Sequence, residues 1–266
     1  MRETSSGHKN NIIIAIMLTW KQFGGEKDKW MIAFCGFGLD ASSYASFYEE
    51  IKQAYNLIVF ENPEQAPLVS LTKDDYISYI KSVLHQADIN EISIISYSLG
   101  SRFNFVCLEK MPEMIEHSIF IAPDGLGFWD GARWSTSLLL RPLFRLFVRR
   151  EELFLTTLKL IRSVRLIPKG MYVFSKWRMR TREERQLVYN TWMNIRNVRP
   201  SLIKLKKQDV SRMLNIYSYF GAQDILIPQS HYRRMKYYFP EGQHTLLQKD
   251  HLLFDSELFK EIAKHI

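Results

Sequence analysis

The sequence alternates short, almost wholly apolar runs with longer segments of helical periodicity. Apolar runs of this length indicate strands buried on both faces, and their alternation with helices indicates a mostly parallel sheet covered on both sides. The predicted strands are Ile12–Thr19, Trp30–Cys35, Leu57–Phe60, Ile92–Ile95, Ser118–Ala122, Leu214–Phe220 and Thr245–Gln248. The predicted helices are Tyr44–Ala54, Lys73–His85, Phe103–Met111, His231–Tyr238 and Leu258–Ile266. We therefore expect an α/β fold with a doubly wound, mostly parallel sheet.

The alternation is interrupted by one long basic, aromatic-rich segment. Residues 127–208 contain 19 Lys and Arg against 5 Asp and Glu, so this segment carries a net charge of +14 and the remainder carries −6. Only helical segments are apparent within it. We therefore predict a core domain formed by residues 1–126 and 209–266, with residues 127–208 as a helical insertion.

Composition limits the class of protein. A chain of 266 residues with 46% hydrophobic residues can bury one sizeable core together with a modest insertion. Two cysteines, Cys35 and Cys107, are too few for a disulfide framework and lack metal-like spacing, so we expect buried thiols and a reducing compartment. The run Ile12–Thr19 is too short to span a bilayer. No small-residue cleavage site follows it closely, so we interpret it as a strand rather than a secretory segment and expect a cytoplasmic protein.

A serine motif follows the fourth predicted strand. The stretch ISYSLGS places Ser98 between small residues two positions before and two positions after it, Ser96 and Gly100. Such spacing suits a strand-to-helix turn so tight that the central residue is strained and lifted from the edge of the sheet. The hydroxyl of Ser98 would then face the positive end of the following helix, with the Leu99 amide directed at whatever it attacks. This makes Ser98 a candidate nucleophile.

Three further features each lie just after a predicted strand: the CGFG turn, Asp224 and His251. The turn CGFG can supply the amide of Phe37 as a second donor beside that of Leu99, although a plain tight turn has the same composition. Asp224 lies in GAQDILIP just after the strand ending at Phe220, and His251 lies in KDHLLF, 27 residues later. A serine hydroxyl needs a base and an orienting acid beside it. The sequence supplies both, in the order nucleophile, acid, base.

With these motifs the sequence resembles the α/β-hydrolase superfamily over essentially its whole length, specifically members with a helical cap between core strands 6 and 7. The resemblance implies cleavage of an ester, thioester, amide or carbon–carbon bond by a catalytic triad. The matching positions are Ser98 for the nucleophile, Asp224 for the acid, His251 for the base, and Phe37 and Leu99 for the oxyanion hole. Two positions depart from the pattern, because Ser96 replaces a usual glycine and Cys35 stands where many relatives have histidine.

Alternatives remain for several residues. Asp124, in IAPDGLG, follows the preceding strand, from which some relatives supply the acid; we expect a turn or cap-entry role instead. We expect the six remaining histidines to be structural or solvated. No group of His, Asp or Glu has the spacing of a zinc or two-metal site, and no glycine loop would cradle a phosphate, so we expect neither metal nor cofactor.

The basic insertion has several interpretations. It can pack an apolar face on the core with a solvated basic surface, roof an apolar acyl pocket with a cationic rim, or rest on an anionic membrane surface. No motif supports a nucleic-acid partner. Arg102 is a candidate substrate-binding residue, with structural pairing as its alternative. We expect a serine hydrolase acting on a small-molecule ester or thioester, with a non-catalytic binding protein or a lyase of the same fold as alternatives.

Overall fold

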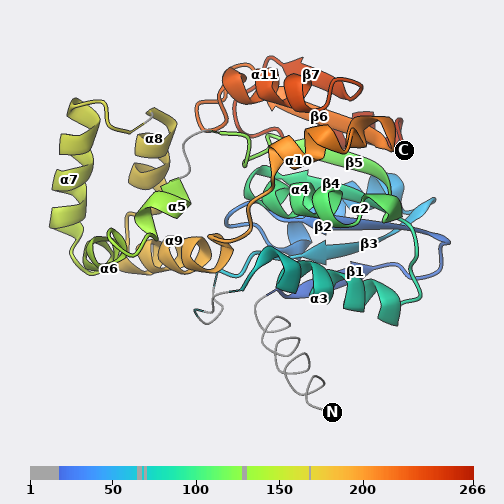
Figure 1. Cartoon of the computed structure of the whole chain (residues 1–266), viewed down its shortest axis with the longest axis horizontal. Coiled ribbons are helices and arrows are strands. Elements are labelled where there is room, and N and C mark those ends of the chain that lie inside the picture. The colour runs from blue at the N-terminus through green and yellow to red at the C-terminus, as the bar shows by residue number, and fades with distance from the viewer. Residues whose placement is uncertain (1–17, 65–67, 69–70, 128–130, 168) are drawn as a thin grey trace, which may run out of the picture. The chain divides into compact units, whose positions relative to one another are not determined.

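The computed structural model describes residues 18–64, 68, 71–127, 131–167 and 169–266. Its core is a seven-stranded sheet in the order β1-β3-β2-β4-β5-β6-β7 (Figure 1). Every neighbouring pair is parallel except β1 and β3, which are antiparallel. The strands are β1 (Trp20–Phe23), β2 (Lys29–Phe34), β3 (Tyr55–Phe60), β4 (Ile92–Tyr97), β5 (Ile115–Ile121), β6 (Asn215–Gly221) and β7 (Gln243–Leu247). The predicted α/β class with a mostly parallel sheet is confirmed.

Six of the predicted strands correspond to β2 to β7, whereas the first does not correspond to a described strand. The range Ile12–Thr19 falls mainly outside the described residues, and β1 begins just after it, at Trp20. The sequence of β1, WKQF, is mostly exposed and carries neither an apolar run nor a clear alternation. Its strand conformation comes from antiparallel pairing with the edge of β3, which sequence periodicity does not report.

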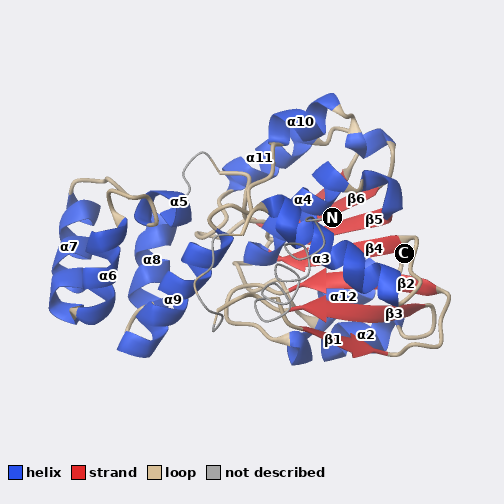
Figure 2. Cartoon of the chain, turned by 60° about the horizontal axis from the view of Figure 1, so that its bottom comes forward, coloured by secondary structure: helices blue, strands red, loops and turns tan. Residues whose placement is uncertain are grey.

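Helices cover both faces of the sheet, because the chain reverses its direction across the sheet at β3 (Figure 2). The connection from β2 to β3 runs one way and that from β3 to β4 runs the other. Right-handed crossovers therefore place their helices on opposite faces. The helix α2 packs against α12, while α3, α4, α10 and α11 form a connected layer. These helices are α2 (Ala45–Ile51), α3 (Lys73–Gln86), α4 (Ser101–Lys110), α10 (Leu202–Lys207), α11 (Gln229–Tyr238) and α12 (Ser256–Ala263).

Four short 3-10 helices complete the core. They are η1 (Ala41–Tyr44), η2 (Ser98–Gly100), η3 (Pro112–Met114) and η4 (Val210–Arg212). The strands β3 and β4 are buried along their whole length, including their polar residues Asn56, Ser93 and Ser96. Both cysteines are buried, and they are not joined by a disulfide. Among the described residues, no helix has both the length and the apolar character needed to cross a bilayer.

The chain divides into two compact units. The core unit comprises 1–62, 71–127 and 198–266, and the helical unit comprises 63–70 and 128–197, as far as these ranges are described. The larger part of the helical unit follows β5 in the chain and precedes β6, the shorter part 63–70 follows β3, and the core helix α10 lies outside the unit. Its helices are α5 (Gly131–Ser135), α6 (Arg141–Arg149), α7 (Glu151–Ser163), α8 (Lys169–Arg178) and α9 (Arg182–Ile195).

The helical unit has its own small aromatic core. The ring of Phe144 packs edge-on against Tyr189 and beside Trp192, which also stacks on Phe174. At one end of this core Arg185 is only 2% exposed. Its guanidinium donates hydrogen bonds to three backbone carbonyls, those of Val148, Met179 and Arg180, at 3.2, 3.2 and 2.7 Å. This buried cation thus joins the end of α6 to the turn between α8 and α9.

Candidate active site

The sheet register brings the loops after five strands to one edge of the core unit. Phe34 pairs with Ser96, and Tyr97 pairs with Ile121 on the next strand, so β2, β4 and β5 end at the same level. The strands β6 and β7 continue this edge, with Gly221 opposite Leu247. In parallel sheets, binding sites gather where strands end in loops, above all where the chain reverses direction across the sheet. Here that point lies between the neighbouring strands β2 and β4, because the connection after β2 runs to β3 on one side and the connection after β4 runs to β5 on the other.

The turn after β4 has the strained geometry that its sequence predicts. Ser98 has a φ of +49°, a left-handed conformation that is unusual for a residue with a side chain. It begins η2, which runs directly into α4. At Gly100 a Cβ atom would collide with the carbonyl oxygens of Phe34 and Cys35. Glycine at this position therefore lets the turn press against the end of β2, which holds Ser98 at the edge of the sheet.

Ser98, His251 and Asp224 form a continuous hydrogen-bonded chain. The Nε2 atom of His251 lies 3.2 Å from the Oγ of Ser98, and its Nδ1 lies 2.7 Å from the Oδ2 of Asp224. The three residues are separated by up to 153 positions in the sequence. The structure thus brings together the three side chains that the sequence predicts as nucleophile, base and acid.

The carboxylate of Asp224 is buried and has several hydrogen-bond donors. Its Oδ1 accepts the amides of Leu226 and Ile227 at 2.8 and 2.9 Å, which leaves Oδ2 for the His251 ring. The side chain has no exposed surface. A buried carboxylate satisfied in this way is fixed in position and can orient an imidazole.

The backbone of the acid loop lies against the loop that carries His251. A Cβ atom at Gly221 would collide with the carbonyls of Lys249 and Asp250, so glycine permits this close approach. The Tyr97 hydroxyl donates to the His251 carbonyl at 2.9 Å, and the two rings lie 5.5 Å apart. Tyr97 was not predicted to be a positioning residue, although it immediately precedes Ser98.

The CGFG turn lies beside the serine turn. Phe37 follows β2, and the preceding carbonyls of Cys35 and Gly36 both accept the side-chain amide of Asn62, at 2.8 and 2.9 Å. Asn62 comes from the loop after β3 and holds this turn. This role was not predicted, although Asn62 lies two residues after the predicted strand. Phe37 and Leu99, the predicted oxyanion positions, thus belong to two turns at the same edge.

Asp124 and Arg102 are bound to each other. The Nε of Arg102 lies 2.7 Å from Oδ2 of Asp124, and Arg102 is 7% exposed. The backbone amide of Asp124 also donates to the carbonyl of Ser98 at 3.0 Å. The pair therefore connects the loop after β5 to the serine turn. For Arg102, this contact is the structural pairing that was the alternative to substrate binding. For the acid, the carboxylate beside His251 is that of Asp224 and not that of Asp124.

The other described histidines lie outside this hydrogen-bonded chain. His244 is held by the Ser218 hydroxyl and the Phe239 carbonyl, each at 2.7 Å. Burial lowers the pKa of His231, His244 and His117, and the nearby Glu116 partly offsets the effect at His117. His8 lies outside the described residues. Within the part of the chain that the structure describes, no group of three or more His, Cys, Asp or Glu could hold a metal ion.

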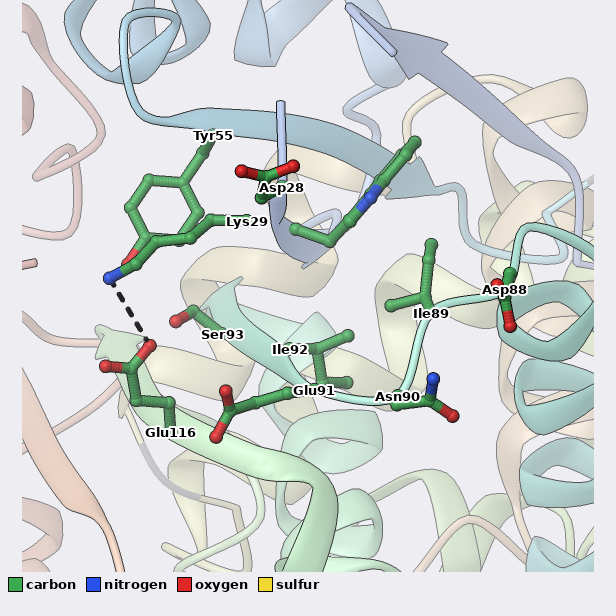
Figure 3. Close-up of a pocket in the computed structure, with 11 residues that line it drawn as sticks. Asp28, Lys29, Tyr55, Asp88, Ile89, Asn90, Glu91, Ile92, Ser93 and Glu116 are labelled. Atoms are coloured by element: carbon green, nitrogen blue, oxygen red, sulfur yellow. Dashed lines mark ion pairs between the residues drawn. The ribbon is translucent and has the colours of Figure 1, made fainter. Parts of the chain in front are cut away.

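A separate hollow of about 250 Å³ lies at the opposite edge of the sheet, where the strands begin (Figure 3). It includes Lys29 and Tyr55, the first residues of β2 and β3, with Glu116 near the start of β5. Lys29 forms an ion pair with Glu116 at 3.8 Å, and Glu91 adds a further carboxylate. This hollow contains no counterpart of the serine, histidine and aspartate chain.

Comparisons with known proteins define the fold. No protein-family model matches the sequence, and no curated protein matches it. Among solved structures, a hydrolase from Oleispira antarctica has a TM-score of 0.61 at 16% identity, with 96% of each chain covered. A thermophilic esterase from Thermogutta terrifontis has a TM-score of 0.63 at 15% identity, covering 93% of this chain and 90% of its own. A bromoperoxidase from Bacillus anthracis has a TM-score of 0.61 at 13% identity, covering 92% and 93%.

These neighbours, together with the strand order and the position of the serine turn, show that the protein has the α/β-hydrolase fold. The predicted resemblance in fold is confirmed. At these identities the likeness concerns the fold, so the chemistry has to be argued from the residues themselves.

Proposed function

We propose that this protein is a serine hydrolase that cleaves an ester or thioester through Ser98, His251 and Asp224. The observation that carries the proposal is the continuous chain of contacts from a buried carboxylate, through an imidazole, to a serine in a strained turn. Solved structures of the same fold include proteins described as a hydrolase and an esterase, which supports this class of reaction.

The arrangement assigns a role to each side chain. His251 accepts the proton of Ser98 through Nε2 while Oγ attacks the substrate carbonyl carbon, and Asp224 stabilises the imidazolium through Nδ1–H. The amides of Phe37 and Leu99 bind the developing oxyanion. The tetrahedral intermediate then expels the alcohol or thiol, which takes its proton from His251. Water, deprotonated by His251, attacks the acyl-enzyme and releases a carboxylic acid and free Ser98.

Two apolar residues next to the triad in the sequence are exposed: Ile225, beside the acid, is 43% exposed, and Leu252, beside the base, is 68% exposed. Ligand sites are lined mainly by apolar side chains, so these two residues are candidates to contact an apolar acyl group. The inserted segment 127–208 is predicted to select the acyl group. Activity measured across a series of acyl-chain lengths tests this prediction.

A fluorophosphonate probe tests the nucleophile directly. We expect it to modify Ser98, because this hydroxyl is partly accessible and lies beside a base, whereas Ser96 and Ser101 are fully buried. Ser98→Ala should abolish both labelling and turnover of p-nitrophenyl esters and acyl thioesters. Peptide mapping by mass spectrometry identifies the modified residue, and Ser101→Ala serves as the control that keeps its label.

The outcomes separate the competing functions. Labelling that persists in Ser98→Ala would refute the assignment of the nucleophile. Labelling of Ser98 without turnover of any ester or thioester would favour a lyase or another reaction of the activated serine. Absence of labelling in the folded wild-type protein would favour a binding protein that has kept the fold.

A further inference from the structure

The helices α6 and α7 of the helical unit expose apolar residues at helical spacing. On the α6 side Leu139, Leu143 and Leu146 are 86, 42 and 43% exposed. Leu143 and Leu146, three residues apart, lie along one side of α6, and Leu139 lies in the turn before it. On α7, the exposed residues Leu153 and Leu160 are two helical turns apart, and the exposed Val164 follows at the C-cap. We call these two sets the leucine stripes.

The stripes are not the sides by which the two helices pack within the helical unit. On α6 the buried residues are Phe144 and Val148, and on α7 they are Phe154 and Leu158. The contact of Phe147 with Phe154 joins the two helices, which lie beside one another in Figures 1 and 2. Each helix therefore has a second apolar side besides the one that forms the interior.

Basic residues accompany the stripes. Residues 133–167 contain eight Lys and Arg against two Glu, a net charge of +6. Arg149, Arg150 and Lys159 are all exposed. Leu138 and Leu166, in the turns flanking the two helices, are 90 and 68% exposed. Exposed leucine among arginine and lysine on neighbouring helices is the composition of helices that lie in the interface of anionic bilayers.

The dimensions exclude a spanning arrangement for these helices. The 13 residues of α7 extend about 20 Å at 1.5 Å per residue, short of the hydrocarbon thickness of about 30 Å. A helix of this length can instead lie parallel to the surface, with leucines among the acyl chains and the basic groups at the level of the phosphates.

We propose that the leucine stripes and the surrounding basic residues form a docking surface for an anionic membrane. Nucleic acid would account for the charge but not for the exposed leucines, and a second copy of this chain would bring two strongly positive surfaces together. An anionic bilayer is complementary to both features. The proposal concerns binding alone and does not depend on the proposed activity.

Co-sedimentation with vesicles tests the surface. We expect the protein to bind vesicles containing phosphatidylglycerol at low salt and to bind vesicles of pure phosphatidylcholine much less. Binding should fall steeply as salt is raised, because interactions between exposed charges are screened over about 10 Å at 0.1 M. Arg149→Gln with Lys159→Gln should weaken binding about fivefold for each charge removed. Leu143→Ser with Leu146→Ser should weaken it about tenfold or more.

Matched controls lie in the core unit. Lys260→Gln with Lys264→Gln removes the same charge from exposed positions of the core, and Ile203→Ser with Met213→Ser removes exposed apolar side chains there. Both controls, and Ser98→Ala, should bind vesicles like the wild type.

Three results would overturn the proposal. The first is no binding to anionic vesicles at low salt. The second is an equal loss in the core controls and in the helical-unit variants. The third is a lipid-free dimer, without vesicle binding, that dissociates when Leu143 and Leu146 are replaced, because this would assign the stripes to contact between copies of the chain.

Discussion

At the scale of single residues, the site separates two aspartates that look alike in the sequence. Both follow strands of the same sheet edge, and both lie in short loops with glycine nearby. Asp224 contacts the imidazole of His251, whereas Asp124 contacts the guanidinium of Arg102. The difference lies in their partners, which come from distant parts of the chain.

This separation predicts opposite effects for the same substitution. Asp224→Asn should lower the rate of acylation by several orders of magnitude, because a comparable change in a serine protease triad costs about 10⁴-fold. Asp124→Asn should weaken the pairing with Arg102 and lower the free energy of unfolding by about 1–2 kcal/mol, since the Asp124 side chain is partly exposed. Burst kinetics with an activated ester and urea unfolding measure the two quantities. The reverse ranking would move the acid to Asp124.

At the scale of elements, the helical unit depends on a buried cation. Arg185 is the residue that joins α6, α8 and α9 through three backbone carbonyls. A lysine has one compact charged group rather than a planar fork of donors, so it cannot reproduce this geometry. Removal of Arg185 leaves carbonyls that are shielded from water and without this donor.

We therefore expect Arg185→Met to destabilise the helical unit by about 2–4 kcal/mol, from several unsatisfied acceptors at about 1–3 kcal/mol each before relaxation. Arg182→Met is the matched control, because Arg182 lies exposed on the same helix and should change stability by less than about 0.5 kcal/mol. Urea unfolding followed by circular dichroism at 222 nm measures the change, because the helical unit consists of helices. Equal effects of the two substitutions would show that the carbonyl contacts contribute little.

At the scale of the whole molecule, three buried or half-buried histidines link stability to pH. Burial lowers the pKa of His117, His231 and His244 below the ordinary value near 6.5. When the pH is above 6.5, the histidines are neutral in the folded and in the unfolded protein, and their contribution to stability is complete. As the pH falls through 6.5, the histidines of the unfolded chain bind protons while those of the folded protein stay neutral, so the unfolded state is favoured.

The free energy of unfolding should therefore fall as pH decreases from about 7.5 to 5, by at most about 1.4 kcal/mol per pH unit for each histidine. Urea unfolding at a series of pH values measures this slope. His231→Gln should flatten it, because one titrating group is removed. Stability that is constant or increases on acidification across this range would contradict the linkage.

The sequence by itself determined the fold class and the residues worth testing. Apolar runs such as Ile92–Ile95 specify buried strands, because strands covered on both faces need apolar side chains throughout. The small residues around Ser98 indicate a tight turn, because only small side chains fit there. The exposed strand β1 could not be predicted, because its conformation depends on pairing with β3 rather than on its own pattern.

Only the tertiary structure decided which partners the polar residues have. The distances from His251 to Ser98 and Asp224, the pairing of Arg102 with Asp124, and the support of the CGFG turn by Asn62 all join segments far apart in the chain. Local sequence fixes which residues follow a strand, since that depends on neighbouring side chains and backbone propensity. Contacts between loops depend on strand order and register, which result from packing the whole sheet and its helices into one core.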